Sequence, residues 1–411
     1  MRFCKKSLAT QRKSKKRQIF KRICRFYLHI CKKCTIFVRF LIFTRIYMHL
    51  HTIKQNMKTQ IFTFLALFLC ASIAWADVDS STSLKAYYAS ANTTSGNQLR
   101  LALQDIIDGH TTISYGDLGT IMQYSDTEGA DGQHVVDIYT DCNFTCSGPI
   151  TWKSSGDVGA GMNREHTVPQ SWFNKQSPMV SDAFHIYPTD CKANNNRSSY
   201  LYGEFSGAGT SSSTSKCRET GKLSTGTSNS IASYSYNGQT YAPTATHSGK
   251  VYEPDDEYKG DLARSYFYMA TRYADVCANW SGGAFGSARN GLNTYTAELM
   301  LKWHRLDPVS EKELIRNEVI YGNTTYNKSS KKQRNRNPFI DYPELVEYIW
   351  GDMQGVSVSI DALDSPYANE SPTTGVEQVS ATERAQKILI NGQLYILVGE
   401  QMYNLQGQRI Q

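Results

Sequence analysis

The sequence predicts an α+β fold assembled from several helices and small sheets. Helical periodicity of apolar side chains runs through Asp261–Tyr273, Thr296–Trp303 and Ser310–Val319. Strand signals are short, as in His134–Tyr139 (HVVDIY). This mixture favours small sheets over a doubly wound parallel sheet, which needs strands and helices in regular alternation.

The first 76 residues predict an export signal behind a basic extension. Residues 57–76 begin with Met, continue through an apolar run and end in Ala74-Trp75-Ala76, the small-x-small pattern of a signal-peptidase site. Residues 1–56 hold 16 Lys or Arg and no Asp or Glu. We expect 1–56 to be an upstream extension from a start codon assigned too early. A long basic n-region or a nucleic-acid-binding arm is the alternative.

Removal of residues 1–76 reverses the electrostatic character of the chain. The whole chain has a net charge of +7, but 17 of its 44 basic residues precede residue 77, and all 37 acidic residues lie from there onward. The remainder therefore has a net charge of −10. Overall basicity then gives no argument for nucleic-acid binding, and an anionic substrate needs local charge or a metal. The apolar stretch at 35–50 is interrupted by Arg39 and Arg45, so no stable membrane insertion is expected.

Five cysteines follow residue 76 and predict one or two disulfides. They are Cys142, Cys146, Cys191, Cys217 and Cys277, in a chain routed to an oxidising compartment. Their odd number leaves at least one unpaired, and the pairing stays open. The Cys142–Cys146 spacing resembles half a zinc site, but no second pair of ligands follows, so zinc is not expected.

Composition divides the rest of the chain into a large domain at 77–360, a linker at 361–378 and a C-terminal β module at 379–411. The linker region contains Pro, Ser, Asn and Gly without periodicity (DSPYANESPTTGVE). Beyond it, apolar residues alternate around Asn391-Gly392, which predicts a β-hairpin. Inside the large domain, the Ser/Thr/Gly-rich tract Gly203–Gly226 predicts an exposed loop.

Two neighbouring segments hold residues suited to phosphodiester hydrolysis. That reaction needs a base to deprotonate water and a cation to neutralise charge in the transition state. The segment NREHTVPQSWF (163–173) supplies Glu165 and His166, and DAFHIYPTDCKANNNRSS (182–199) supplies Asn194 and Arg197. Neutral imidazole suits the base near pH 7, and carboxylate and amide oxygens suit Mg²⁺.

Local geometry does not decide whether these residues form one site. Adjacent residues of a strand face opposite sides, so Glu165 and His166 serve one site only if the strand edge curves or a metal sits at its rim. A short helix after Pro188 would place Asn194 and Arg197 on one face, although the run of three asparagines favours a loop. A Glu-His pair taken alone is more often a solvated strand end.

Together the two segments resemble the signature of the endonuclease I family, secreted and periplasmic nucleases with a ββα-metal (His-Me finger) core. Further matching segments follow in order, and the resemblance covers roughly residues 80–350. These segments are YEPDDEYKGDLARSYFYMATRY (252–273), LKWHRLDPVSEKELIRNEVIY (301–321) and NRNPFIDYPELVEYIW (335–350).

The resemblance implies a role for the candidate residues. His166 would be the general base that activates water, and Glu165 and Asn194 would be the direct ligands of one Mg²⁺, with Mn²⁺ or Ca²⁺ as substitutes. Members of the family cleave DNA, and often RNA, with little sequence preference. That agrees with contacts that address phosphate rather than base edges. Arg197 completes the expected catalytic set, as a phosphate contact or as a structural ion pair.

Other side chains keep two interpretations. Arg164 contacts phosphate or forms an ion pair, and His185 is a neighbour of the base or the base itself. Asp182 is expected to fix its loop or to hold an outer-sphere water rather than to bind a metal directly. Some relatives hold the product phosphate with an arginine between the His strand and the helix. Here only Lys175 and Lys192 are cationic in that interval, so the group is not identified.

One predicted helix has a repeating polar face. Arg264, Tyr268 and Arg272 recur every four residues, which predicts a phosphate-binding ridge or a solvated face with core residues behind it.

The C-terminal residues YNLQGQRI (403–410) are similar to sorting domains that direct Bacteroidetes proteins through type IX secretion after the signal peptide has brought them to the periplasm. The similarity implies a secreted or cell-surface protein of a Gram-negative, Bacteroidetes-like source, with the secretion machinery as a partner. A hairpin packed on the catalytic domain is the alternative.

The sequence thus predicts a secreted, Mg²⁺-dependent, non-specific endonuclease, expected to be a monomer. Two alternatives remain, a phosphodiesterase acting on another substrate such as nucleotides and a surface binding module without catalysis. The intact set of Glu165, His166 and Asn194 argues against the second.

Overall fold

The computed structural model describes residues 83–128, 132–367, 386–390, 393–398 and 401–403. The predicted extension 1–56, the predicted signal peptide 57–76 and part of the predicted linker lie outside the described residues. Among the helices that the structure does describe, none is both long enough and apolar enough to span a membrane.

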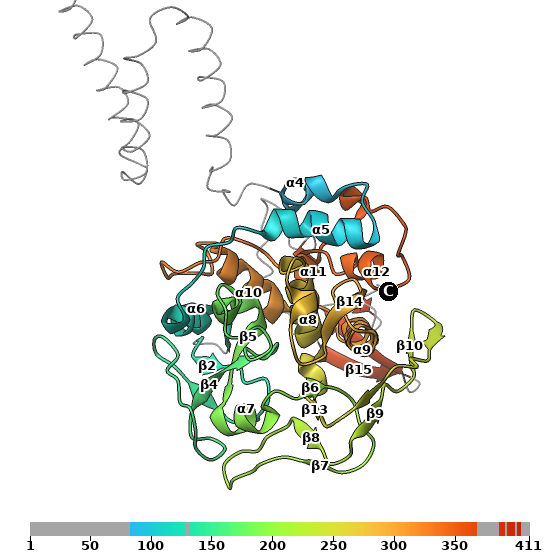
Figure 1. Cartoon of the computed structure of the whole chain (residues 1–411). Coiled ribbons are helices and arrows are strands. Elements are labelled where there is room, and N and C mark those ends of the chain that lie inside the picture. The colour runs from blue at the N-terminus through green and yellow to red at the C-terminus, as the bar shows by residue number, and fades with distance from the viewer. Residues whose placement is uncertain (1–82, 129–131, 368–385, 391–392, 399–400, 404–411) are drawn as a thin grey trace, which may run out of the picture. The chain divides into compact units, whose positions relative to one another are not determined.

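Helix α8 (Lys259–Arg272) is the centre of the helical part. Every residue of α8 after Lys259 is buried. It packs against α5 (Gly96–Ile107), α9 (Thr294–Leu306) and α11 (Pro338–Asp341), and Figure 1 shows α8 among these helices. The other described α-helices are α4 (Leu84–Tyr87), α6 (Leu118–Ser125), α7 (Cys191–Arg197), α10 (Glu311–Tyr321) and α12 (Leu345–Ile349).

The three helices that the sequence predicts are confirmed as α8, α9 and α10, with small shifts at their ends. Local signals explain the ends of α10. The Ser310 hydroxyl accepts from the Glu313 N–H, and the Glu313 carboxylate accepts from the Ser310 N–H, which is a capping box. Gly322, at a φ of 102°, ends the helix in the left-handed conformation.

The expectation of a phosphate-binding ridge or a solvated face on α8 is wrong in both forms. Arg264, Tyr268 and Arg272 are all buried. Arg264 donates to the Glu313 carboxylate at 2.6 Å, so its charge is neutralised inside the protein. Periodicity identified the helix, but long-range partners decided that all its faces are enclosed.

The strands are short and form small sheets, as predicted. A four-stranded sheet has the order β6-β13-β8-β7, and β1, β2 and β3 form another. The strands outside the candidate site are β1 (Thr127–Glu128), β2 (His134–Val135), β3 (Phe144–Thr145), β6 (Leu201–Tyr202), β7 (Gly209–Thr210), β8 (Lys222–Ser224), β9 (Ser228–Ser230), β10 (Tyr234–Tyr236), β11 (Gln239–Tyr241), β12 (Thr246–Ser248), β13 (Val251–Glu253) and β14 (Phe285–Arg289).

Two strand predictions need correction. The tract Gly203–Gly226 is not wholly a loop, because it contains β7 and β8, and Leu223 of β8 pairs with Tyr252 of β13. The predicted strand at 134–139 is reduced to His134–Val135. Both differences come from pairing with distant segments, which local composition does not specify.

The two segments with candidate catalytic residues form a β-β-α unit. β4 (Met162–His166) pairs antiparallel with β5 (Ile186–Asp190), with Glu165 opposite Tyr187 and His166 opposite Ile186. α7 follows β5 directly and contacts both strands. The Asp190 carboxylate accepts from the N–H groups of Lys192 and Ala193, and this cap starts a helix that the asparagine run disfavours. Of the helix and the loop that the sequence left open after Pro188, the structure therefore has the helix.

The C-terminal strands form a three-stranded antiparallel sheet of β15 (Gln386–Ile390), β16 (Gln393–Val398) and β17 (Gln401–Tyr403). Ile390 pairs with Gln393 across residues 391–392, as the predicted hairpin requires. Residues 361–367 of the predicted linker pack on the helical part. Leu363 is buried, and the Tyr367 hydroxyl donates to the Leu314 carbonyl at 3.0 Å.

One disulfide, Cys142–Cys217, joins segments 75 residues apart. It confirms the expected presence of a disulfide and gives a pairing that the sequence left open. Because the Cys142 sulfur is in this bond, the pair Cys142 and Cys146 does not offer two thiolates to a zinc ion. Cys146, Cys191 and Cys277 are free.

We expect Cys142→Ser to lower the free energy of unfolding by roughly 2–5 kcal/mol, because the bridge restricts a long loop in the unfolded chain. Urea denaturation followed by circular dichroism measures the change. Cys146→Ser is the matched control, since Cys146 is free. Equal stability of the two variants would show that the bridge does not restrict the unfolded chain.

Candidate active site

A pocket of about 300 Å³ lies where β4, the loop after it and α7 meet. It brings Glu165, His166 and Asn194 together, so both residues of the Glu-His pair face one site despite the alternation along the strand. Its described lining residues are Arg164, Glu165, His166, Pro169, Gln170, Ser171, Lys175, Asn194, Asn195, Arg197, Ser198 and Ser199.

Glu165 is a buried carboxylate held at one oxygen. Its Oε1 accepts from the hydroxyls of Tyr139 at 2.7 Å and Tyr202 at 3.3 Å, and lies 3.2 Å from Arg197 Nη1. Burial raises the pKa of Glu165 above its ordinary value, while Arg197 and the two tyrosines oppose that shift. Because these three partners approach Oε1, none of them occupies Oε2.

His166 is held as a neutral base. Its Nε2 lies 3.1 Å from the Val180 carbonyl oxygen, and a carbonyl only accepts, so Nε2 carries the proton. Burial, and then the neighbouring His185, lower the pKa of His166 to about 3. The unprotonated Nδ1 of a neutral ring is the nitrogen that can accept a proton.

Asn194 lies on α7, the helix of the β-β-α unit. Its Nδ2 donates to the Arg164 carbonyl at 3.3 Å. Because Nδ2 makes this bond, Oδ1 is the amide atom that remains to act as an acceptor or a ligand. Strand β4 thus orients the amide that α7 supplies.

Arg197 lies beneath the pocket with 1% of its surface exposed. Nη1 donates to the His166 carbonyl at 3.0 Å and Nη2 to the Thr167 carbonyl at 2.6 Å, beside the ion pair with Glu165. Burial opposes the charge of Arg197, but Glu165 raises its pKa overall. These contacts are those of the structural ion pair that the sequence left open beside a phosphate contact.

The loop before β5 is fixed by Asp182. Its carboxylate accepts from the hydroxyls of Tyr268 at 2.9 Å and Tyr273 at 2.8 Å and from Gln333 Nε2 at 3.0 Å. These contacts correspond to loop fixing, one of the two roles that the sequence left open. His185 is fully buried behind His166, with ring centroids 5.5 Å apart, and its Nε2 bonds to the Met179 carbonyl at 2.7 Å.

The two lysines between Thr167 and Asn194 differ in position. Lys175 is exposed and lines the pocket, whereas Lys192 is not among the lining residues. The backbone of Lys175 is left-handed, at a φ of 55°, and its N–H donates to the Gln170 carbonyl at 2.8 Å. This turn brings the Lys175 side chain to the rim of the site.

Sequence reasoning missed the aromatic residues around these groups. Tyr139 and Tyr202 hold Glu165, while Tyr115 and Trp152 lie against the Arg164 guanidinium. All four come from outside the two catalytic segments. Their side chains have no special spacing relative to those segments, so one sequence gives no signal for them.

The residues present fit a hard divalent cation. Mg²⁺ prefers oxygen ligands, keeps several waters and needs few protein groups. Glu165 with its second oxygen and Asn194 with its oriented Oδ1 meet that requirement. The described residues contain no group of three or more His, Cys, Asp or Glu side chains placed to hold a metal, so a site built wholly of such side chains is not found in them.

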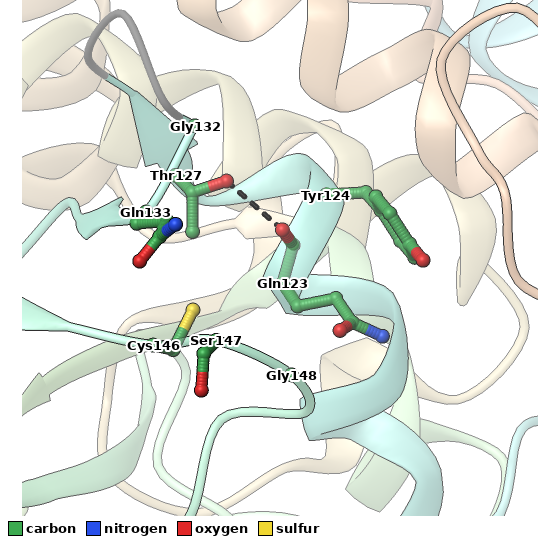
Figure 2. A pocket seen from close by; sticks show the side chains of 8 residues that line it. All are labelled: Gln123, Tyr124, Thr127, Gly132, Gln133, Cys146, Ser147 and Gly148. Atoms are coloured by element: carbon green, nitrogen blue, oxygen red, sulfur yellow. Dashed lines mark hydrogen bonds between the residues drawn. The ribbon is translucent and has the colours of Figure 1, made fainter.

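A larger pocket of about 470 Å³ has a different lining (Figure 2). Its residues are Gln123, Tyr124, Thr127, Gly132, Gln133, Cys146, Ser147 and Gly148, none of which is acidic, basic or a histidine. The Thr127 hydroxyl donates to the Gln123 carbonyl at 2.9 Å in its wall. Burial raises the pKa of the Cys146 thiol, which disfavours a reactive thiolate. The chemistry of the lining, not its volume, therefore selects the candidate active site.

An α+β domain whose pocket joins a neutral imidazole, a carboxylate and an amide is suited to hydrolysis of phosphodiesters. Comparison with known proteins agrees with this class, because residues 95–344 match the family described as Endonuclease I. The chain belongs to the Endonuclease I family and is a nuclease, a hydrolase of phosphodiester bonds.

Two relatives are both named extracellular ribonuclease. The extracellular ribonuclease of Bacillus amyloliquefaciens is 32% identical over 287 residues, which are 67% of this chain and 81% of that protein. The extracellular ribonuclease of Bacillus subtilis (strain 168) is 30% identical over 284 residues, 67% of this chain and 80% of that protein.

We expect the protein to lose stability as the pH falls below about 6.5, because His185 is buried in its neutral form. Burial, opposed by Asp182, lowers the pKa of His185 to about 4. Between the unfolded value near 6.5 and pH 4, the unfolded chain binds more protons, so the free energy of unfolding decreases toward acid by roughly 2–3 kcal/mol from this group.

His185→Gln should flatten that dependence in urea denaturation series at pH 4 to 7. The exposed His134→Gln is the control. An unchanged slope in His185→Gln would mean that other groups cause the acid sensitivity.

Proposed function

We propose that this nuclease is a secreted, Mg²⁺-dependent endonuclease that cleaves DNA and RNA with little sequence preference, through a ββα-metal core made of β4, β5 and α7. The observation that carries the proposal is the convergence of Glu165, His166 and Asn194 in one pocket on that unit.

His166 is the general base in this proposal. Its Nδ1 takes a proton from a water molecule, the water oxygen attacks phosphorus, the P–O3′ bond breaks, and the leaving oxygen is protonated by solvent. The support is the hydrogen bond of Nε2 to the Val180 carbonyl, which leaves Nδ1 as the basic nitrogen.

Glu165 and Asn194 hold the ion in this proposal, and Mn²⁺ or Ca²⁺ substitutes for Mg²⁺. When bound, the ion supplies positive charge that stabilises the transition state and the leaving oxygen. Arg197 acts as a positioning residue, because it holds the Glu165 carboxylate and the carbonyls at the end of β4. Tyr139 and Tyr202 complete the support of Glu165.

The substrate class follows from the kind of contacts that the pocket offers. The lining supplies cationic, amide and hydroxyl groups suited to phosphate and sugar, which carry no sequence information. The relatives named extracellular ribonuclease support RNA as a substrate beside DNA. Lys175, at the rim, is the group that we assign to the product phosphate in place of an arginine.

The export route is part of the same proposal. The predicted signal at 57–76 leads to the periplasm, and the C-terminal module at 379–411 engages type IX secretion, with a Bacteroidetes-like bacterium as the source. The extracellular relatives and the paired strands β15, β16 and β17 support an exported protein with a C-terminal β module. We expect the secreted nuclease to act as a monomer.

The purified protein should degrade plasmid DNA and a matched RNA in Mg²⁺, and EDTA should abolish both activities. Removal of the ion removes charge neutralisation at phosphorus. Gel assays of both substrates, with Mg²⁺ added back in excess of the chelator, measure the effect. Cleavage that persists under stringent chelation would rule out the metal role.

His166→Ala should reduce kcat by roughly 10²-fold or more, because a general base contributes on that scale. The Mg²⁺ concentration that gives half-maximal rate should stay nearly constant, since His166 is not a ligand. His185→Gln is the matched comparison, because it alters the neighbouring ring. If His166→Ala keeps full activity and His185→Gln loses it, His185 is the base.

Glu165→Gln should shift the Mg²⁺ activation curve to higher concentration, because an amide oxygen is a weaker ligand than a carboxylate. Gln is preferred to Ala because its oxygen can still accept from Tyr139 and Tyr202 and limits the cost of leaving Arg197 buried without its partner. Rate against Mg²⁺ concentration is the measurement. An unchanged curve would remove Glu165 from the ligands.

A further inference from the structure

The guanidinium of Arg164 lies against two aromatic rings at the edge of the pocket. Its Cζ lies 4.3 Å from the ring centroid of Tyr115 and 4.5 Å from that of Trp152. Arg164 is two residues before His166 on β4, and residues two apart on a strand face the same side. The Tyr115 ring is also nearly parallel to the His166 ring, at 22° with centroids 5.9 Å apart. Arg164 therefore lies on the side of the general base.

Arg164 has no acidic partner among the described residues. Its Nε is buried and has no hydrogen-bond acceptor there, and no described carboxylate lies within 4.0 Å of the guanidinium. Burial lowers the pKa of Arg164, with Tyr115 opposing the shift. Several arginines that are more deeply buried do have such partners, as in the pairs Arg197–Glu165, Arg264–Glu313, Arg316–Asp126 and Arg336–Asp341.

The two rings restrict how a ligand can approach. Guanidinium donors lie in the plane of the group, so contact of its Cζ with the Tyr115 and Trp152 rings does not by itself use them. An anion binds best at the edge of the group, where the donors form a fork that matches two oxygens of one phosphate. The stacking also partly dehydrates the cation and holds it at fixed orientation, which lowers the cost of ordering it on binding.

A purely structural role does not explain this arrangement. Stacking of a cation on rings contributes modestly to stability. Arg164 nevertheless lines the same pocket as Glu165, His166 and Asn194, and no described carboxylate neutralises its charge. Arg197, whose Nε is likewise buried without an acceptor, differs because it is paired with Glu165. These observations indicate that the missing anionic partner of Arg164 belongs to the substrate.

The geometry points to Arg164 as a phosphate-binding residue, which holds one phosphodiester oxyanion of the bound nucleic-acid strand at its in-plane edge, with Tyr115 and Trp152 as positioning residues. The inference rests on the proposed function, because it assigns a substrate group to the same pocket. It also supplies local positive charge in a region of the chain whose net charge is negative.

The test uses Arg164→Met, which keeps an apolar stem against the rings without charge, and Arg164→Lys, which keeps charge without the planar fork. Binding of a fluorescent single-stranded oligonucleotide is followed by anisotropy in EDTA at several salt concentrations. Arg164→Met should weaken binding about tenfold and reduce the slope of log K against log salt by about 0.7, the value for one phosphate on a single strand.

Arg164→Lys should keep the slope and still lose affinity several-fold. In Mg²⁺, Arg164→Met should raise KM more than it lowers kcat. The control is Arg218→Met, whose side chain is 72% exposed and pairs with Asp141 outside the pocket. It should leave affinity and slope unchanged.

A second readout locates the contact. Oligonucleotides with one neutral methylphosphonate linkage, moved along the strand, should show one position where the wild type loses about tenfold in affinity and Arg164→Met loses nothing.

The outcomes separate the two proposals. If the wild type binds and cleaves but Arg164→Met keeps the slope and the linkage pattern, with only a lower melting temperature, the residue is structural and the inference is overturned. If the wild type cleaves no polynucleotide at all, the proposed function itself fails.

Discussion

The buried ion pair between Arg197 and Glu165 is the interaction on which the site depends. Arg197 ends α7, and its guanidinium binds the Glu165 carboxylate and the carbonyls of His166 and Thr167 at the end of β4. Loss of either partner would leave a charge buried without compensation, which typically costs 3–5 kcal/mol. These contacts therefore hold α7 against the end of β4, where the Glu165 carboxylate and the His166 imidazole must be positioned together.

Helices α10 and α8 hold the start of β5 and the loop before it. Arg316 of α10 donates to the carbonyls of Ala183 and Ile186, just before and at the start of β5. Tyr268 of α8 reaches Asp182 in the same loop. A set of largely buried helices therefore acts as a rigid wall for a short two-stranded sheet, which could not keep its geometry alone. Rigid support of this kind is what precise placement of a base and two ligands requires.

Sequence reasoning reached elements whose signals are local, such as the periodic helices α8, α9 and α10 and the hairpin around residues 391–392. It did not use the caps at Ser310, Gly322 and Asp190, and it left the segment of α7 open between a helix and a loop. It also grouped the candidate site residues correctly into one pocket, although their catalytic roles rest on the proposal. It failed on α8 and on the tract 203–226, where distant partners decide whether a polar residue is buried and whether a flexible stretch pairs as a strand.

The sequence by itself determined the motif, the order of its elements and the types of functional group available. Only the tertiary structure decided how each cation is used. Arg164 and Arg197 are equivalent in the sequence, yet Arg197 is enclosed by a carboxylate and carbonyls, while Arg164 lies against two aromatic rings without an acidic partner among the described residues. The physical reason is that the role of a charged group depends on the acceptors within a few ångströms of it, and folding brings these acceptors from segments far apart in the chain.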